Sequence, residues 1–144
     1  MANQNYNAVL TYEVKLDGVT SDTFIRVSGI GKELEDIAAK DDAGKTTVNT
    51  PGSMNARDIT LVRRFSGDKS LYTWFQEVQD KGNGAKLRTG SVRLLNHEQK
   101  QVAQFDIEGT WIKAWYGPEL TKDVHGNSLL TETVVISVGE VKMV

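Results

Sequence analysis

The segment AVLTYEVKL, residues 8–16, decides the class of this fold. Its apolar side chains recur at every second position, as Ala8, Leu10, Tyr12, Val14 and Leu16. Successive side chains of a strand point to opposite faces, so this period of two predicts a strand with one buried face. Asp17 and Gly18 follow as a turn signal, and residues 24–28 resume the extended pattern. We expect the two strands to pair as a hairpin.

The next segment, residues 32–51, is polar and too long for a simple turn. A turn signal, Asp41-Asp42-Ala43-Gly44, divides it. We therefore expect a long exposed hairpin. Gly44-Lys45-Thr46 also resembles the end of a phosphate-binding P-loop, but that loop requires a glycine where Ala39 stands and a helix after it. The hairpin turn is the better interpretation.

The hydrophobic period changes after the alternating residues 59–65. The next apolar side chains are spaced i, i+3, i+4 and i+7, as Leu71, Trp74, Phe75 and Val78. This spacing places them on one stripe of an amphipathic helix, which we expect at about 68–81. Asp68 or Ser66 is suited to cap the start of that helix, and Gly82 to cap its end.

Further strands are predicted after the helix, at residues 91–95, 101–107, 110–116 and 131–138. With about seven or eight strands and one helix, the expected fold is mainly β. It consists of two packed antiparallel sheets, sandwich-like or barrel-like, in a single domain over residues 1–144. Trp111 and Trp115 are expected on one strand face, sharing a core with Trp74 of the helix stripe.

The composition excludes several classes of protein. The 144 residues carry a formal net charge of −2 and no cysteine. The chain thus lacks the basic excess of a dedicated nucleic-acid-binding domain, and it has no disulfide, thiolate nucleophile or cysteine zinc site. Its start, MANQNYNAVL, has no basic segment followed by an apolar one, so we expect no signal peptide. No apolar stretch is long enough to predict a membrane anchor.

Residues that could carry catalysis or bind a metal are few and scattered. His97 and His125 stand apart in turn-like segments, and no third ligand follows at a spacing that predicts a metal site. No serine lies in a strained elbow of the kind that hydrolases use. We therefore expect no catalytic, cofactor-binding or metal-binding residue, and no enzymatic activity.

Two basic clusters have two interpretations. They consist of Arg57, Arg63 and Arg64, and of Lys81, Lys86, Arg88 and Arg93. One interpretation is contact with a polyanion. Because the chain is slightly acidic, salt bridges within the fold or across a subunit interface are the preferred one.

A series of short motifs follows one order along the chain. They are FIRVSGIG (24–31) with Glu33 and Glu35, PG (51–52), ITLVR (59–63), LYTWF (71–75), GSVRLL (90–95) after Arg88, Trp111 and Trp115 before GP (117–118), and ETV (132–134). Together they resemble the inner-tube protein family of contractile phage tails, R-type bacteriocins and extracellular contractile injection systems. Two positions depart from the family pattern: Arg64 stands in place of a frequent glycine, and Ile112 in place of a proline.

The resemblance implies a structural subunit and no cofactor. Six protomers form a ring whose inner strands join into one barrel, and rings stack into a hollow tube whose lumen carries a cargo protein or DNA. The implied partners are further copies of the chain, a surrounding sheath protein, and baseplate, initiator and terminator proteins. Assembly in the cytoplasm is followed by residence in a virion tail or an extracellular particle. The alternatives are a baseplate tube-initiator protein of the same fold and a free-standing small β-barrel that binds a ligand.

The subunit and ring interfaces are expected on the polar hairpin and on the arginine-rich strand beside it. The candidate residues are Asp41, Asp42, Lys45, Met54, Arg57, Arg63 and Arg64. The tip of the hairpin carries charges of both signs, and complementary charge fixes the orientation of one subunit against the next. This places the predicted site on an assembly surface.

Overall fold

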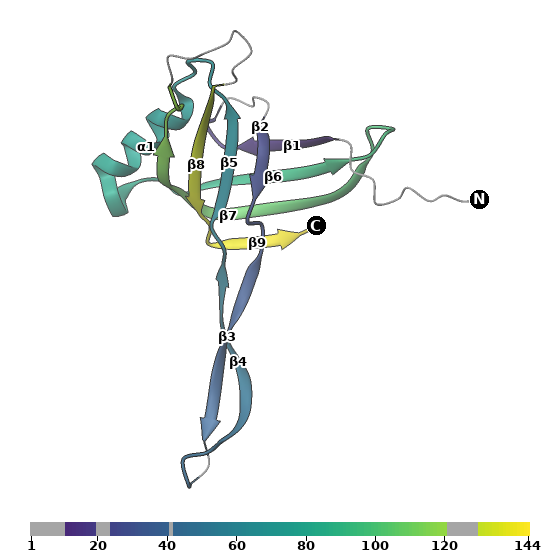
Figure 1. Cartoon of the computed structure of the whole chain (residues 1–144), viewed down its shortest axis with the longest axis vertical. Helices are drawn as coiled ribbons and strands as arrows, with labels where there is room; N and C mark the ends of the chain where they lie inside the picture. The colour runs from purple at the N-terminus through teal and green to yellow at the C-terminus, as the bar shows by residue number, and fades with distance from the viewer. Residues whose placement is uncertain (1–10, 20–23, 41, 121–129) are drawn as a thin grey trace, which may run out of the picture.

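The computed structural model describes residues 11–19, 24–40, 42–120 and 130–144 (Figure 1). Over these ranges the chain forms nine strands, one α-helix and one short 3-10 helix. The strands are β1 (Thr11–Leu16), β2 (Phe24–Ser28), β3 (Lys32–Lys40), β4 (Thr46–Ala56), β5 (Ile59–Arg64), β6 (Arg88–Leu95), β7 (Gln101–Tyr116), β8 (Thr131–Ser137) and β9 (Glu140–Met143). The helices are α1 (Ser70–Lys81) and η1 (Gly82–Gly84). The predicted class, mainly β with two antiparallel sheets and one helix, is confirmed.

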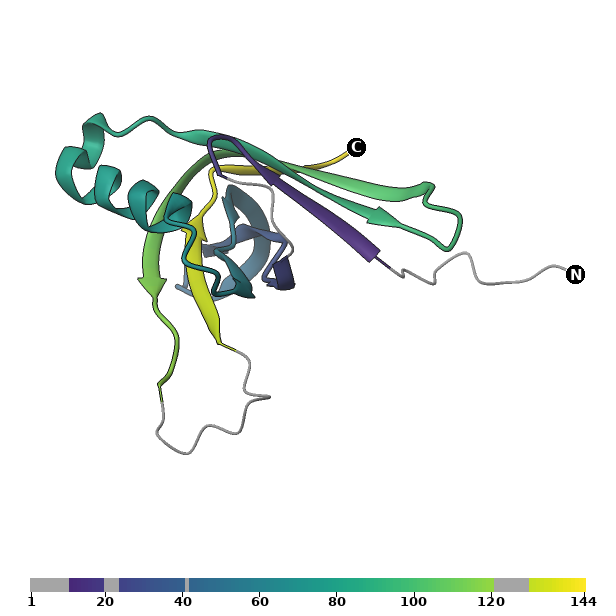
Figure 2. The same ribbon diagram turned by 90° about the horizontal axis from the view of Figure 1, so that it is seen from above.

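Two antiparallel sheets share the long strand β7. The first sheet has the order β1-β6-β7-β9, and the second has the order β7-β8-β5-β2. In Figure 1 the strands of the first sheet run across the molecule, and those of the second run along its long axis. Seen from above, α1 lies beside the bend at which β7 passes from one sheet to the other (Figure 2).

Two glycines form the corner between the sheets. Gly109 has φ +64°, a left-handed conformation that glycine adopts at no steric cost, and the register of β7 against β6 shifts beside it. Gly139 lies against it, and its N–H donates to the Glu108 carbonyl at 2.9 Å. The predicted separate strands at 101–107 and 110–116 are therefore one bent strand.

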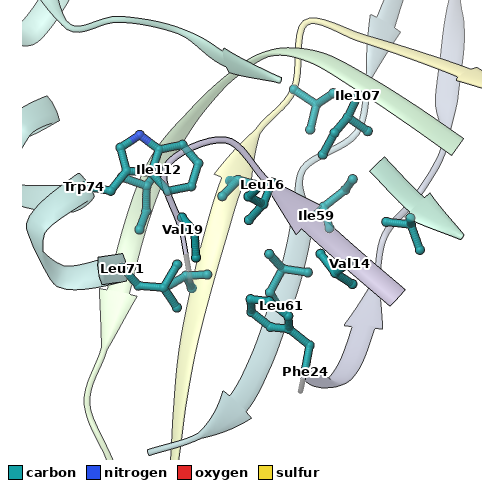
Figure 3. Close-up of a cluster of buried hydrophobic side chains, with 14 of the residues drawn as sticks. Val14, Leu16, Val19, Phe24, Ile59, Leu61, Leu71, Trp74, Ile107 and Ile112 are labelled. Atoms are coloured by element: carbon teal, nitrogen blue, oxygen red, sulfur yellow. The ribbon is translucent and has the colours of Figure 1, made fainter. Parts of the chain in front are cut away.

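The hydrophobic core fills the angle between the two sheets and α1 (Figure 3). The labelled side chains come from both sheets, from the helix and, for Val19, from the turn after β1: Val14, Leu16, Val19, Phe24, Ile59, Leu61, Leu71, Trp74, Ile107 and Ile112. The alternation of β1 is confirmed by buried Val14 and Leu16, and the helical stripe by buried Leu71 and Trp74. These residues supply the apolar burial that stabilises the protomer.

The predicted hairpin of residues 8–16 with residues 24–28 is wrong. β1 pairs with β6, where Val14 faces Val92, and β2 pairs with β5, where Val27 faces Leu61. The two strands are consecutive in sequence but lie at the edges of different sheets. The turn at Asp17-Gly18 is formed, with the Val19 N–H donating to the Leu16 carbonyl at 3.1 Å, but it does not pair the two strands. An alternating pattern fixes which face of a strand is buried but not which strand it pairs with.

The shared tryptophan core is wrong for one of the three residues. Trp74 is fully buried and Trp115 packs against the core, whereas Trp111 is 38% exposed. The register of β7 against β8 shifts between Ile112 and Ala114. An extra residue at a bulge reverses the alternation, so Trp111 and Trp115 point to opposite faces.

The predicted ends of the helix are close to the observed ones. The N-cap is Lys69 rather than the predicted Asp68 or Ser66. Asp68, one residue earlier, accepts a 2.7 Å hydrogen bond from the Ser70 N–H at the start of the helix. Gly82 ends the helix with φ +52°, and its N–H donates to the Val78 carbonyl. Strand β9 was not predicted, because its four residues follow Gly139 and are too short to show a period.

Candidate functional site

The hairpin of β3 and β4, residues 32–56, forms an arm that projects from the body of the protein (Figure 1). All nine residues of β3 are exposed, and the two strands pair only with each other. The predicted exposed hairpin is confirmed, and it is longer than expected because β4 continues through Pro51 to Ala56. A two-stranded ribbon is marginally stable alone, so this length of unsupported ribbon indicates a surface built to contact another molecule.

The arm exposes apolar side chains on both of its faces. Leu34 is 62% exposed and lies opposite Met54, while Ile37 is 47% exposed. Since neighbouring residues of a strand point to opposite faces, Leu34 and Ile37 lie on different faces of β3. Val48, opposite Ala39, shares the face of Ile37 and is 56% exposed. Within residues 11–19, 24–40, 42–120 and 130–144, no core side chains cover either face.

The base of the arm is fixed to the body. The Lys32 ammonium donates to Glu140 of β9 at 3.1 Å, and the Arg57 N–H donates to the Gly31 carbonyl at 2.9 Å. The side chain of Arg57 also forms a long ion pair with Glu33, at 3.9 Å. The Lys32 ammonium holds the pKa of the Glu140 carboxyl below its ordinary value. The Lys32–Glu140 contact orients the arm relative to the first sheet, and the Arg57 contacts join the two sides of the arm at its base.

Replacing Lys32 by alanine is expected to raise the pKa of Glu140 toward the ordinary glutamate value of about 4.3. Lys32 is the largest cause of the depression, and the charge of Lys142 is a smaller one. NMR titration of the Glu140 side chain measures this shift, and Lys142→Ala is the matched control with a smaller rise. Because the pKa of Glu140 is lower in the folded protein than in the unfolded chain, the ion pair with Lys32 stabilises the fold at neutral pH. This stabilisation is lost as the pH falls through the pKa of Glu140. An unchanged Glu140 pKa in Lys32→Ala would show that the ion pair is absent in solution.

The predicted site residues fall in three places. Asp42 and Lys45 lie exposed at the tip of the arm, while Met54 lies on the arm and Arg57 at its base. Arg64 is exposed at the end of β5, remote from the tip. Asp41 lies outside the described residues. Arg63 is buried inside the protomer, with 1% of its side chain exposed.

A buried ion pair joins Arg63 of β5 to Glu132 of β8. The Arg63 Nε donates to Glu132, whose other oxygen accepts a 3.0 Å hydrogen bond from the Trp115 indole. Both charged side chains are 1% exposed. The guanidinium also reaches the Ser70 hydroxyl at 3.4 Å and thereby ties the start of α1 to the second sheet. The salt-bridge interpretation of the basic clusters is confirmed for Arg63, for Arg88 with Glu77 and for Arg93 with Glu13.

An aromatic groove of about 460 Å³ lies at the N-terminal end of α1. It is lined by Phe65, Gly67, Asp68, Lys69, Tyr72, Thr73, Gln76, Trp115 and Glu132. Tyr72 and Trp115 meet edge to face with their ring centroids 5.0 Å apart. Sequence analysis did not predict this groove, because it joins residues far apart in the chain. One residue could have indicated it: Tyr72 is an aromatic residue that lies outside the apolar stripe of α1 and is therefore expected on the surface.

The first sheet has two free edges and one polar face. β1 and β9 are its outer strands, and neither has a second partner in the described part of the chain. The face opposite the core carries charges of both signs on neighbouring strands. Glu13 lies opposite Arg93. A second row crosses all four strands, with directly paired neighbours: Lys15, Ser91, Asp106 and Lys142. An exposed sheet edge is a template for pairing with a further strand.

The histidine and carboxylate side chains of the described residues do not converge on a metal site. No group of three histidine, aspartate or glutamate side chains there is placed to hold a metal ion. His97 is exposed in the turn after β6, and His125 lies outside the described residues. None of the helices described is long and apolar enough to cross a membrane.

One family model matches nearly the whole chain. It is described as T4-like virus tail tube protein gp19, and it matches residues 9–142. A search of the curated proteins finds no significant match.

Several solved structures share the fold. One belongs to the sheath–tube complex of PVC, an extracellular contractile injection system, with 18% identity, a TM-score of 0.76, and 94% of this chain and 90% of that chain covered. A second comes from the tube-terminating cap of the anti-feeding prophage, with 18% identity, a TM-score of 0.79, and 100% and 94% covered. A third is Hcp1 from Flavobacterium johnsoniae, with 16% identity, a TM-score of 0.55, and 91% and 94% covered.

Proposed function

The chain belongs to the T4-like virus tail tube protein family, and from this premise we propose that it forms stacked hexameric rings with a hollow lumen. The arm is the observation that carries the proposal. A segment with apolar side chains exposed on two faces is stabilised when other subunits cover both. The chain then acts as one 144-residue domain whose role is mechanical rather than catalytic.

The free edges of the first sheet supply the contact within a ring. When β1 of one protomer pairs with β9 of the next, the sheets close into a barrel and no edge stays exposed. Such a contact joins two different surfaces. Successive subunits then form a closed ring when the rotation from one subunit to the next is a whole fraction of 360°, as it is for six subunits. The polar face of the first sheet then lines the lumen, through which a cargo protein or DNA passes.

The arm supplies the contact between rings. Its tip residues Asp42 and Lys45, with Asp41 beside them in sequence, set the register, and Met54 lies within the covered surface. Arg57 and Arg64 stay candidates for contacts at the two ends of the protomer. Arg63 is buried and ion-paired, and it acts by holding its own protomer together.

The proposed partners follow from the tube. They are further copies of the chain, a sheath protein outside, and initiator, baseplate and terminator proteins at the ends. Rings assemble in the cytoplasm and end in a virion tail or an extracellular particle. A tube-initiator of the baseplate, also a member of this fold, is the second candidate: the fold also matches a chain from the anti-feeding prophage baseplate, at 18% identity and a TM-score of 0.76.

Removal of the distal arm is expected to abolish tubes while rings remain. Leu34 and Met54 are directly paired, so residues 35–53 are replaceable by an Asn-Gly turn that closes a two-residue hairpin. The first and second sheets make no use of these residues, so the protomer folds. Sedimentation and negative-stain microscopy of the parent and the variant measure the result, and thermal unfolding verifies the fold.

Two outcomes contradict the proposal. If the parent protein forms neither rings nor tubes at any concentration tested, the assembly function is wrong. If the variant without residues 35–53 forms tubes of normal length, rings stack through a surface other than the arm.

A further inference from the structure

The aromatic groove at the N-terminal end of α1 has no role in holding the protomer's own arm. The arm leaves the body at one end of the long axis, whereas β5 ends and α1 begins at the other end (Figure 1). A tube that grows without limit requires a head-to-tail contact between two different surfaces. The arm and the groove lie at opposite ends of one protomer, as such a contact demands.

The arm and the groove complement each other in apolar character. One face of the arm exposes the apolar side chains of Ile37 and Val48, at 47% and 56%. In the groove, Phe65 is 37% exposed and Tyr72 is 39% exposed, with Trp115 behind Tyr72. An apolar ribbon seated on these rings removes both surfaces from water, and this burial favours association.

The two surfaces also complement each other in charge. Glu35 shares the face of Ile37, and it has no ion pair among the residues that the structure describes. Lys69 lines the groove and is exposed, and Arg64 directly precedes Phe65. The two carboxylates of the groove, Asp68 and Glu132, both lie near Arg63. Together with Arg64 and Lys69, these five side chains carry three positive charges and two negative ones, so the positive sign is kept.

We propose that the aromatic groove receives the arm of a second copy of this chain in the adjacent ring. The face with Glu35, Ile37 and Val48 lies against Phe65 and Tyr72, and Glu35 pairs with Lys69. The inference rests on the proposed assembly into stacked rings. It adds the receiving surface, which neither the fold nor the family match assigns.

Engineered disulfides test this contact without background, because the chain contains no cysteine. The test variant carries Ile37→Cys on the arm and Gln76→Cys in the groove, both at exposed positions. Oxidation of assembled tubes is expected to give a ladder of linked chains on non-reducing gels. Because each link passes to the next ring, the ladder extends beyond six chains, whereas links inside a hexameric ring stop at six.

The matched control moves the second cysteine to another apolar groove. That groove, of about 410 Å³, lies at the C-terminal end of α1 and is lined by Leu87 and Trp111 among others. The variant with Ile37→Cys and Leu87→Cys is expected to stay monomeric on the gel. A ladder from this control alone, or a ladder that ends at six for the Gln76 variant, overturns the proposal.

A charge exchange provides the second measurement. Lys69→Glu is expected to reduce the yield of tubes at least tenfold while rings remain, and Glu35→Lys in the same chain is expected to restore them. Failure of the double variant to recover tubes, with both single variants folded, overturns the pairing. If the cysteine-free parent forms no tubes, the proposed function itself fails and this inference falls with it.

Discussion

Replacing Trp74 by alanine is expected to lower the free energy of unfolding by about 3–5 kcal/mol, the range found for large aromatic residues in cores. The indole is fully buried, and it packs between the helix and the sheets (Figure 3). The guanidinium of Arg88 lies over the ring, 4.7 Å from its centroid, so the variant also loses a cation–π contact. Chemical denaturation of the unassembled protomer, followed by circular dichroism, measures the loss.

The control for this prediction is Trp74→Phe. Among the described residues the indole N–H of Trp74 has no hydrogen-bond partner, so the smaller ring gives up no polar contact. Its loss of stability is therefore expected to be much smaller than that of alanine. If Trp74→Ala unfolds like the parent but no longer assembles, the residue acts at an interface and its assignment to the core is wrong.

Glu132→Gln is the second large effect, with an expected loss of about 3–5 kcal/mol. The substitution keeps the size of the side chain, removes its charge and replaces one acceptor oxygen by an NH2 donor. The Arg63 guanidinium is then buried without its main counter-ion. The carboxylate of Asp68 lies 3.8 Å from that guanidinium and compensates in part, so we expect the lower end of the range. Denaturant unfolding of the single variant provides the measurement.

A double variant distinguishes the destabilisation caused by one unpaired buried charge from the net contribution of the ion pair to stability. Arg63→Met combined with Glu132→Leu removes both charges, and buried ion pairs replaced in this way often leave stability unchanged or higher. We therefore expect the double variant to be more stable than Glu132→Gln. A double variant that is less stable than Glu132→Gln would show that the pair itself, with its bonds to Trp115 and Ser70, supplies the stability.

The sequence predicted well which elements form and which of their faces are buried. It predicted poorly which strands pair with each other. The alternation of β1, the apolar stripe of α1 and the exposed hairpin are local patterns, and each is observed. The pairing of β1 with β6 joins segments separated by most of the chain, and no local pattern contains it. The bulge after Ile112 reverses one face without leaving a trace in residue type, which is why Trp111 was misplaced.

The candidate site was predictable in part for the same reason. The arm is continuous in sequence, so its polarity and its turn signal were sufficient to locate it. The aromatic groove joins Phe65, Tyr72 and Trp115 from three elements, and only the folded chain brings them together. Arg63 is an interface candidate in the sequence only as a member of the basic cluster with Arg57 and Arg64. Its buried partner, Glu132, lies 69 positions away, so no local pattern reveals the pair.

The shared strand β7 has a consequence for how the assembled protein bears force. Its sixteen residues are continuous through the corner at Gly109, so a load applied to the second sheet reaches the first sheet along a covalent backbone. In Figure 1 the strands of the second sheet run parallel to the arm, which is the direction of load in the proposed stack of rings. A push along these strands loads the hydrogen bonds between β5 and β8 in shear, so several must break together rather than one after another. We therefore expect the protomer to resist force along its long axis better than force across it.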